Sequence, residues 1–147
     1  MDKKTAQTKL AHLCSRREYC VSDLQKKLVK WGLQENNIFE ILNSLQKENY
    51  INEERYAIAF VKDKFRFNHW GSVKIKYALQ QKQIPENFIA IALNEIDEAE
   101  CESLIKKKIQ DKKRTLKADS DYVLQQKVMK SLMAKGFPYE KIKKLYS

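Results

Sequence analysis

The feature of this sequence that most constrains its fold is an apolar pattern that occurs three times. In each copy, four apolar residues follow one another at spacings of four, five and five positions. The copies are Leu24, Leu28, Leu33 and Ile38, then Ile75, Leu79, Ile84 and Ile89, then Val128, Leu132, Phe137 and Ile142. Two apolar residues one turn apart, a third at a bend and a fourth on the next segment predict a helical corner with a buried inner side.

Glycine and proline punctuate these corners. Gly32 and Gly136 stand at the same place in the first and third copies, where a left-handed residue would end a helix. Pro85 and Pro138 coincide in the second and third copies, and each suits the first turn of a helix. Only three Gly and two Pro occur in 147 residues. We therefore predict an all-α fold of three tandem three-helix modules, about nine helices, in an elongated, curved array.

Each corner is preceded by a further amphipathic segment, which makes every copy a three-helix unit. We predict the modules to span residues 1–51, 52–97 and 98–147. Their first helices are expected to bury one face each, namely Ala6, Leu10, Leu13 and Cys14; Tyr56, Phe60 and Phe67; and Cys101, Leu104, Ile105 and Ile109. Asn52 and Ser22 suit the N-caps of the helices that follow them. Residues 112–120 are the one longer linker that we expect.

The sequence offers little for catalysis or metal binding. His12 and His69 lie in different units, outside any recognisable motif, and no glycine-rich phosphate loop occurs. A zinc site from His12, Cys14 and Cys20 is conceivable, but structural zinc sites use tighter paired spacings. We interpret the three cysteines as reduced packing residues. The prediction is a protein that is not an enzyme and that uses no metal or cofactor.

Charge is the clearest pointer to a partner. The formal net charge is +10, and residues 98–147 carry 13 basic and 7 acidic side chains. Such an excess attracts a polyanion or an acidic protein surface. The competing interpretation for any one cluster is a solvated helix face. The candidate partner-binding or DNA-binding residues are Arg16, Arg17, Lys26, Lys27, Lys30, Arg55, Lys62, Lys64, Arg66, Lys74, Lys106, Lys107, Lys113, Arg114, Lys127 and Lys130.

Two other nucleic-acid interpretations stay open. Aromatic side chains near these charges could stack on unpaired bases, although a core role is commoner; they are Trp31, Trp70, Tyr50, Tyr56, Phe65 and Phe67. Residues 22–45 also have the short glycine-containing turn of a helix-turn-helix, with Gln34, Asn36 and Asn37 able to read base edges. The same corner recurs in the other units, but the three units share no set of basic residues at the positions that would contact DNA bases.

Several short motifs resemble those of the RecX family, and in order and spacing they cover nearly the whole chain. They are Ser15-Arg16-Arg17-Glu18, Asp23-Leu24, Lys27-Leu28 and Gly32; Tyr50-Ile51-Asn52-Glu53-Glu54-Arg55-Tyr56-Ala57; Gly71 with Ile75, Leu79 and Ile84-Pro85; and the tail from Lys127 through Lys135-Gly136-Phe137 to Ile142. The chain departs from the family at Asn52, where an acidic residue is usual. It departs again at Gln83, where the family usually has Gly.

The resemblance implies a partner of the RecA recombinase. A family member is expected to lie in the groove of the RecA filament on single-stranded DNA, to contact more than one protomer, and to restrain ATP hydrolysis and strand exchange. Direct nucleic-acid binding and a scaffold for another protein are the alternatives. No apolar run approaches the roughly 20 residues of a membrane span. We therefore expect a cytoplasmic monomer without membrane contact.

Overall fold

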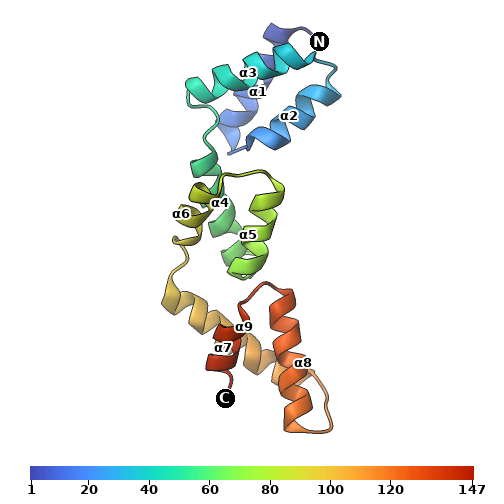
Figure 1. Ribbon diagram of the computed structural model, residues 1–147, viewed down its shortest axis with the longest axis vertical. Coiled ribbons are helices and arrows are strands. Elements are labelled where there is room, and N and C mark those ends of the chain that lie inside the picture. The colour runs from blue at the N-terminus through green and yellow to red at the C-terminus, as the bar shows by residue number, and fades with distance from the viewer.

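The molecule is built entirely from helices. The computed structural model describes all 147 residues and contains nine α-helices and no strand. They are α1 (Lys3–Arg16), α2 (Val21–Lys30), α3 (Glu35–Lys47), α4 (Glu53–Arg66), α5 (Ser72–Gln81), α6 (Glu86–Leu93), α7 (Glu98–Thr115), α8 (Asp121–Ala134) and α9 (Tyr139–Leu145). Figure 1 shows an elongated body in which they pack in consecutive groups of three. The predicted all-α class with tandem three-helix units is confirmed.

We call α1–α3, α4–α6 and α7–α9 the first, second and third modules. They follow one another along the long axis, with the two chain ends in the outer modules (Figure 1). No helix combines the length and the hydrophobicity that a membrane crossing would need.

The three predicted corners share one backbone structure. After α2, the N–H of Leu33 donates to the carbonyl oxygen of Leu28 at 3.1 Å. The equivalent bonds after α5 and α8 are Ile84 to Leu79 and Phe137 to Leu132, each at 3.2 Å. This pattern ends a helix when the preceding residue is left-handed. Those residues are Gly32, Gln83 and Gly136, with φ angles of 84°, 62° and 95°.

Gln83 shows that the corner forms without glycine. A left-handed conformation costs a residue that carries a Cβ about 1–2 kcal/mol. The backbone bond that closes the corner is nevertheless made, and the following Ile84 is buried. Burial of an isoleucine side chain contributes about 1.5–3 kcal/mol, which offsets the strain.

The apolar pattern faces inward as predicted. Eleven of its twelve positions are buried, and Leu33 is half-buried. The first module has its own core of nine buried residues, to which Ile51 contributes from the chain that follows α3. The second and third modules share one continuous cluster of 17 buried residues, which also takes in Cys20. The second and third modules are therefore fused by packing, whereas the first is a separate core.

Side-chain caps start the first helix of every module. Asp2 accepts a hydrogen bond from the N–H of Thr5 at 2.7 Å, Asn52 from Arg55 at 3.0 Å and Asp97 from Glu100 at 3.0 Å. Each satisfies a backbone N–H that the helix leaves free. The predicted cap at Asn52 is confirmed.

The prediction that Ser22 caps a helix is wrong. Cys20 is the N-cap residue of α2, so Ser22 lies inside the helix. Its buried hydroxyl donates instead to the carbonyl oxygen of Lys82 in the second module, at 2.7 Å. Pro85 and Pro138 are likewise the N-cap residues of α6 and α9, one position before the predicted first turn.

Two further predictions need correction. Phe67 was expected on the buried face of its helix, but α4 ends at Arg66 and Phe67 is 80 % exposed. The buried face of α4 is instead Ala57, Val61 and Phe65. The linker is shorter than predicted, because the charged run of residues 112–115 continues helix α7 and only residues 116–120 connect it to α8.

The two junctions between modules use equivalent positions. Lys82 and Lys135 occupy the same place in the repeat, just before the left-handed residue of the corner. At the first junction the Lys82 carbonyl accepts from the Ser22 hydroxyl. At the second, the Lys135 carbonyl accepts from the N–H of Gly71 at 2.8 Å. The start of each middle helix thus binds the corner of the next module.

Candidate functional site

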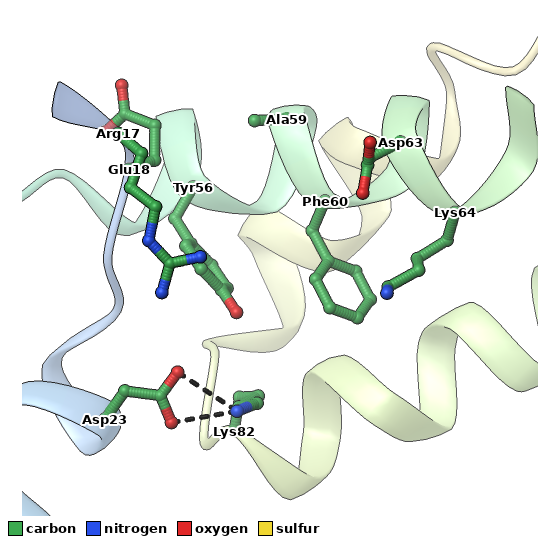
Figure 2. Close-up of a pocket in the computed structure, with 9 residues that line it drawn as sticks. All are labelled: Arg17, Glu18, Asp23, Tyr56, Ala59, Phe60, Asp63, Lys64 and Lys82. Atoms are coloured by element: carbon green, nitrogen blue, oxygen red, sulfur yellow. Dashed lines mark hydrogen bonds and ion pairs between the residues drawn. The ribbon is translucent and has the colours of Figure 1, made fainter. Parts of the chain in front are cut away.

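A groove of about 500 Å³ opens where the first module meets the second (Figure 2). Its walls come from the chain after α1, the first turn of α2, helix α4 and the end of α5. The lining residues are Arg17, Glu18, Asp23, Tyr56, Ala59, Phe60, Asp63, Lys64 and Lys82. Three of these side chains are basic and three are acidic. The groove is therefore close to charge-balanced and does not by itself favour a polyanion.

An ion pair crosses this groove. The ammonium group of Lys82 donates to both carboxylate oxygens of Asp23, at 2.8 and 3.0 Å (Figure 2). Both side chains remain partly exposed, and such pairs contribute about 0–1 kcal/mol. Together with the bond from Ser22 to the Lys82 carbonyl, the pair fixes how α2 sits on the corner after α5.

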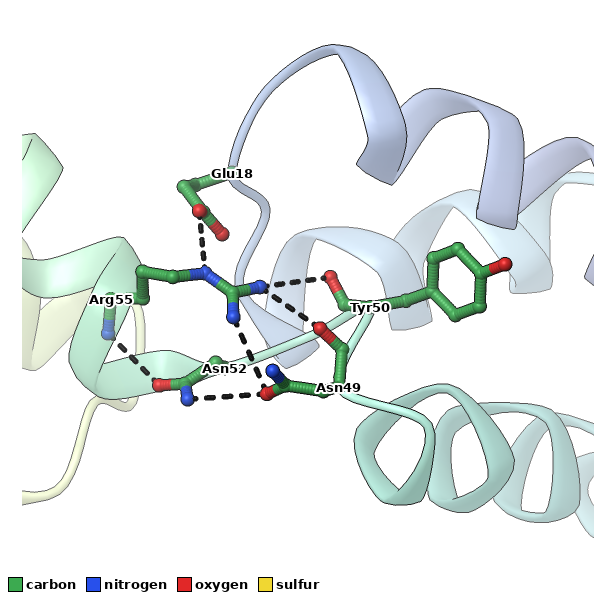
Figure 3. A network of polar contacts seen from close by, with 5 residues as sticks. All are labelled: Glu18, Asn49, Tyr50, Asn52 and Arg55. Carbon is green, nitrogen blue, oxygen red and sulfur yellow. Dashed lines mark hydrogen bonds and ion pairs between the residues drawn. The ribbon is translucent and has the colours of Figure 1, made fainter.

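Arg55 makes a second set of polar contacts at the same junction (Figure 3). Its Nε donates to Glu18 at 2.6 Å, and its Nη2 donates to the carbonyl oxygens of Asn49 at 3.1 Å and Tyr50 at 3.4 Å. The second Glu18 oxygen, Oε1, is buried without a hydrogen-bond partner. Arg55 was predicted to bind a partner, but its guanidinium group is engaged within the chain. These contacts link the second module to the first.

Glu53 supplies a cap to the neighbouring module. No side chain of the first module caps α2, and the N–H of Val21 donates to the Glu53 carboxylate at 3.1 Å. Burial raises the pKa of Glu53, while the bond from Val21 opposes that rise. A carboxylate at the start of a helix is also favoured by the helix dipole. Glu53 therefore joins α4 to α2.

Aromatic rings and cations alternate along α4 towards the third module. The rings of Tyr56 and Phe60 lie 5.9 Å apart. The ammonium group of Lys64 lies 5.5 Å from the Phe60 ring and 5.1 Å from the Trp70 ring, and that of Lys74 lies 4.5 Å from Trp70. Such contacts contribute about 0.5–1 kcal/mol at exposed sites. The two lysines therefore cover the chain's own rings.

Among the aromatic residues considered for base stacking, Phe67 is the most accessible. Phe65 is buried, Tyr56 and Trp70 pack against the core, and Trp31 lies under Lys9. Tyr50 is 38 % exposed, whereas Phe67 is 80 % exposed. Phe67 is therefore the ring that best suits contact with another molecule.

The remaining candidate basic residues do not gather into one site. Lys113 lies over the Tyr146 ring, and Lys127 donates to the carbonyl oxygen of Lys117. The exposed candidates lie on all three modules and are Arg16, Arg17, Lys26, Lys30, Lys62, Arg66, Lys106, Lys107, Arg114, Lys127 and Lys130. The structure thus spreads these charges along the molecule, as a long contact surface requires.

The three cysteines are free thiols. Cys20 is buried, with its sulfur 3.3 Å from the Ser22 hydroxyl, and burial raises its pKa. No group of three or more His, Cys, Asp or Glu side chains is arranged to hold a metal ion.

A second hollow, of about 330 Å³, lies in the third module between α7 and the end of α8. Its polar lining consists of Lys108, Lys112, Ser131 and Lys135, with Leu132 and Phe137 as apolar walls. We call this hollow the lysine pocket. None of its three lysines was among the predicted binding residues. A comparison of the repeats could have found Lys135, because it occupies the place of Lys82.

Two family models match the chain in succession. The model of the second three-helix domain of RecX matches residues 52–93, and the model of the third matches residues 97–145. Together they cover more than half of the chain and coincide with α4–α6 and α7–α9. The chain belongs to the RecX family.

Similar sequences carry the RecX name. The chain is 36% identical over 121 residues to the regulatory protein RecX of Clostridium perfringens (strain SM101 / Type A), covering 80% of this chain and 56% of that protein. It is 31% identical over 137 residues to that of Streptococcus sanguinis (strain SK36), covering 93% and 52%. The chain therefore spans about half the length of the curated RecX relatives that it matches.

Solved RecX structures have the same fold. A crystal structure of a regulatory protein RecX superimposes with a TM-score of 0.87 at 26% identity, covering 97% of this chain and 71% of that one. RecX from Lactobacillus salivarius superimposes with a TM-score of 0.86 at 24% identity, covering 97% and 93%. The arrangement of the three modules is therefore that of the RecX fold, the first module included.

Proposed function

We propose that this chain regulates the RecA recombinase by binding the RecA filament on single-stranded DNA, and that it mainly inhibits ATP hydrolysis and strand exchange. It would act in the cytoplasm, in homologous recombination and DNA repair, by binding and not by catalysis. The observation that supports this most directly is the match to a RecX crystal structure over 97% of the chain. The names of its relatives describe them as regulatory proteins.

The shape suits a contact that runs along a filament. The modules are arranged along one axis, and exposed basic side chains are present on each of them. With a net charge of +10, the body is attracted to acidic or nucleic-acid surfaces over a range that salt shortens. Two or three weak module contacts on one chain also gain from high effective concentration.

The junctions between modules bear on how such binding could restrain a filament. The second and third modules share one core, and the first is attached through Ser22, Asp23 and Arg55. A body whose modules hold fixed positions favours one spacing of the protomers that it bridges. It shifts the filament between states only by its differential affinity for them. In this proposal, the bridged spacing is one that hydrolyses ATP slowly.

A titration of ATP hydrolysis tests the proposal. RecA is assembled on single-stranded DNA, the purified chain is added, and the rate of ATP hydrolysis is measured. We expect the rate to fall at ratios at or below one chain per RecA protomer. An unchanged rate at a tenfold excess over RecA would exclude this function.

Competition for DNA is the alternative that must be separated from binding to the filament. The titration is therefore repeated with three times as much single-stranded DNA at the same RecA concentration. Inhibition that persists indicates that the filament is the target. Inhibition that disappears would instead assign the chain to direct DNA binding. The affinity of such binding falls steeply as the salt concentration rises.

A further inference from the structure

The lysine pocket differs from the groove of Figure 2 in its charge. Lys108, Lys112 and Lys135 are its only charged lining residues, and no acidic side chain lines it. None of the three takes part in an ion pair within 4 Å. By contrast, the groove at the first junction contains as many acids as bases. The pocket therefore holds three positive charges without compensation.

The repeat shows how this excess arises. Lys82 and Lys135 occupy equivalent positions, and Lys82 is neutralised by Asp23. The position equivalent to Asp23 in the second module is Lys74. At the second junction a basic residue thus replaces the acid, and Lys74 lies over Trp70 instead of pairing. The Lys135 ammonium group makes one long contact, 3.5 Å from the carbonyl oxygen of Asn68.

The loop between α4 and α5 lies next to the pocket. The contact between Lys135 and Asn68 links the two, and the next residue in the loop is His69. Burial lowers the pKa of His69, and Lys108 and Lys107 of α7 and Lys135 of the corner after α8 lower it further. The residue before Asn68 is Phe67, whose ring is 80 % exposed.

We propose that the lysine pocket binds a phosphate group of a single-stranded nucleic acid, and that the ring of Phe67 stacks on a base of the same strand. Ammonium groups bind phosphate as point charges, and the hydroxyl of Ser131 adds a neutral donor. Exposed aromatic rings beside basic side chains are typical of sites for unpaired strands, because every base offers a flat face. The proposal concerns nucleic acid without RecA and does not depend on the regulatory function.

A binding assay without RecA tests it. The full chain is titrated into a fluorescently labelled oligothymidylate, and the dissociation constant is obtained from anisotropy at several salt concentrations. The variant Lys108→Glu/Lys135→Glu is compared with Lys4→Glu/Lys47→Glu, which makes the same change of net charge in the first module. We expect the pocket variant to lose at least tenfold in affinity and the control less than threefold. Equal losses in the two variants would overturn the proposal.

The ring is tested separately. Phe67→Ala is expected to weaken binding about fivefold or more, because stacking contributes about 1–3 kcal/mol for each base, and Phe67→Tyr should keep near-normal affinity. An equal loss in both, or none in either, would contradict the stacking role. Circular dichroism and melting temperature show that every variant is folded. If Lys108→Glu/Lys135→Glu fails that check, Lys108→Gln/Lys135→Gln takes its place.

The two histidines allow NMR to show where on the chain the oligonucleotide binds. The ring shifts of His69 and His12 are followed by NMR as pH is varied, with and without the oligonucleotide. A phosphate bound in the pocket should raise the pKa of His69, and His12, which lies in the first module, should not respond. No change at His69 at saturation would overturn the site. A response to inorganic phosphate as large as that to the oligonucleotide would identify a free phosphate as the ligand and overturn the assignment to a strand.

Discussion

Gly71 and Gly136 touch through their backbones at the junction of the second and third modules. A Cβ atom added to Gly71 would lie 2.3 Å from the carbonyl carbon of Gly136, and one added to Gly136 would lie 2.4 Å from the Cβ of Lys74. The contact is reinforced by two hydrogen bonds, from Gly71 to Lys135 at 2.8 Å and from Val73 to Gly136 at 2.9 Å. The absence of side chains here allows the two modules to share one core.

We expect Gly71→Ala to lower the free energy of unfolding by about 1–3 kcal/mol, the usual range for forced overpacking. The φ of Gly71 is −80°, which alanine adopts freely, so the loss is steric. Gly32→Ala is the control, because its φ is +84° but no atom lies within 4 Å of the added Cβ. Gly32→Ala should lower the free energy of unfolding only by the backbone strain of the left-handed alanine, about 1–2 kcal/mol. Urea unfolding measures both, and NMR spectra should show shifts spreading across the second junction for Gly71→Ala alone.

Leu28→Ala should destabilise the protein by about 2–5 kcal/mol, because Leu28 is fully buried and its loss leaves a cavity. The adjacent Val29 is 60 % exposed, and Val29→Ala should change stability by no more than about 0.5 kcal/mol. Thermal melting compares the two. A melting temperature for Leu28→Ala within a degree of the wild type would show that the first core is not packed as described.

Reversal of Lys26, Lys27 and Lys30 to Glu should weaken the effect on RecA without unfolding the chain. Lys26 and Lys30 are exposed and Lys27 is half-buried, and changes at exposed positions rarely alter stability by more than about 0.5 kcal/mol each. The control, Lys4→Glu/Lys47→Glu/Lys117→Glu, makes the same charge change outside the predicted binding residues. The inhibition constant for ATP hydrolysis should rise more for the first triple variant than for the second. Equal inhibition constants would remove this helix face from the proposed contact surface.

His69 should make stability depend on pH in the weakly acidic range. Burial and the nearby lysines hold its pKa in the folded protein below the ordinary value of 6.5. Its stabilising contribution is therefore complete above pH 6.5 and is lost as pH falls through the lower folded pKa. His69→Asn removes the titration and suits the positive φ of 56° at this position. The difference in unfolding free energy between wild type and variant should shrink from pH 8 to pH 5. A constant difference would contradict the assignment.

Most of the fold could be predicted from the sequence. Contacts between residues close in the chain produce the corners, the buried apolar positions and the cap at Asn52. Such contacts appear in the sequence as a regular spacing of apolar and capping residues. The errors also have a local origin. Phe67 fits the periodicity of α4 but lies one residue beyond its end, and Ser22 has the chemistry of a cap but binds the next module instead.

Less of the candidate site could be predicted. The charge excess and its spread over three modules were visible, but the actual neighbours of each charge were not. Arg55 was a candidate for binding a partner and is engaged with Glu18, while Lys135 was not a candidate and lies in the lysine pocket. These outcomes depend on which residues from separate modules come within a few ångströms.

The sequence by itself determined that this protein is a chain of three helical corners with a positive surface, because hydrogen bonding and apolar burial within each corner are encoded at fixed short spacings. Only the tertiary structure decided that Gly71 meets Gly136, that Asp23 neutralises Lys82, and that Lys108, Lys112 and Lys135 share one hollow. Those contacts join segments distant in the chain and depend on how whole modules are oriented. The periodicity of the sequence does not specify that orientation.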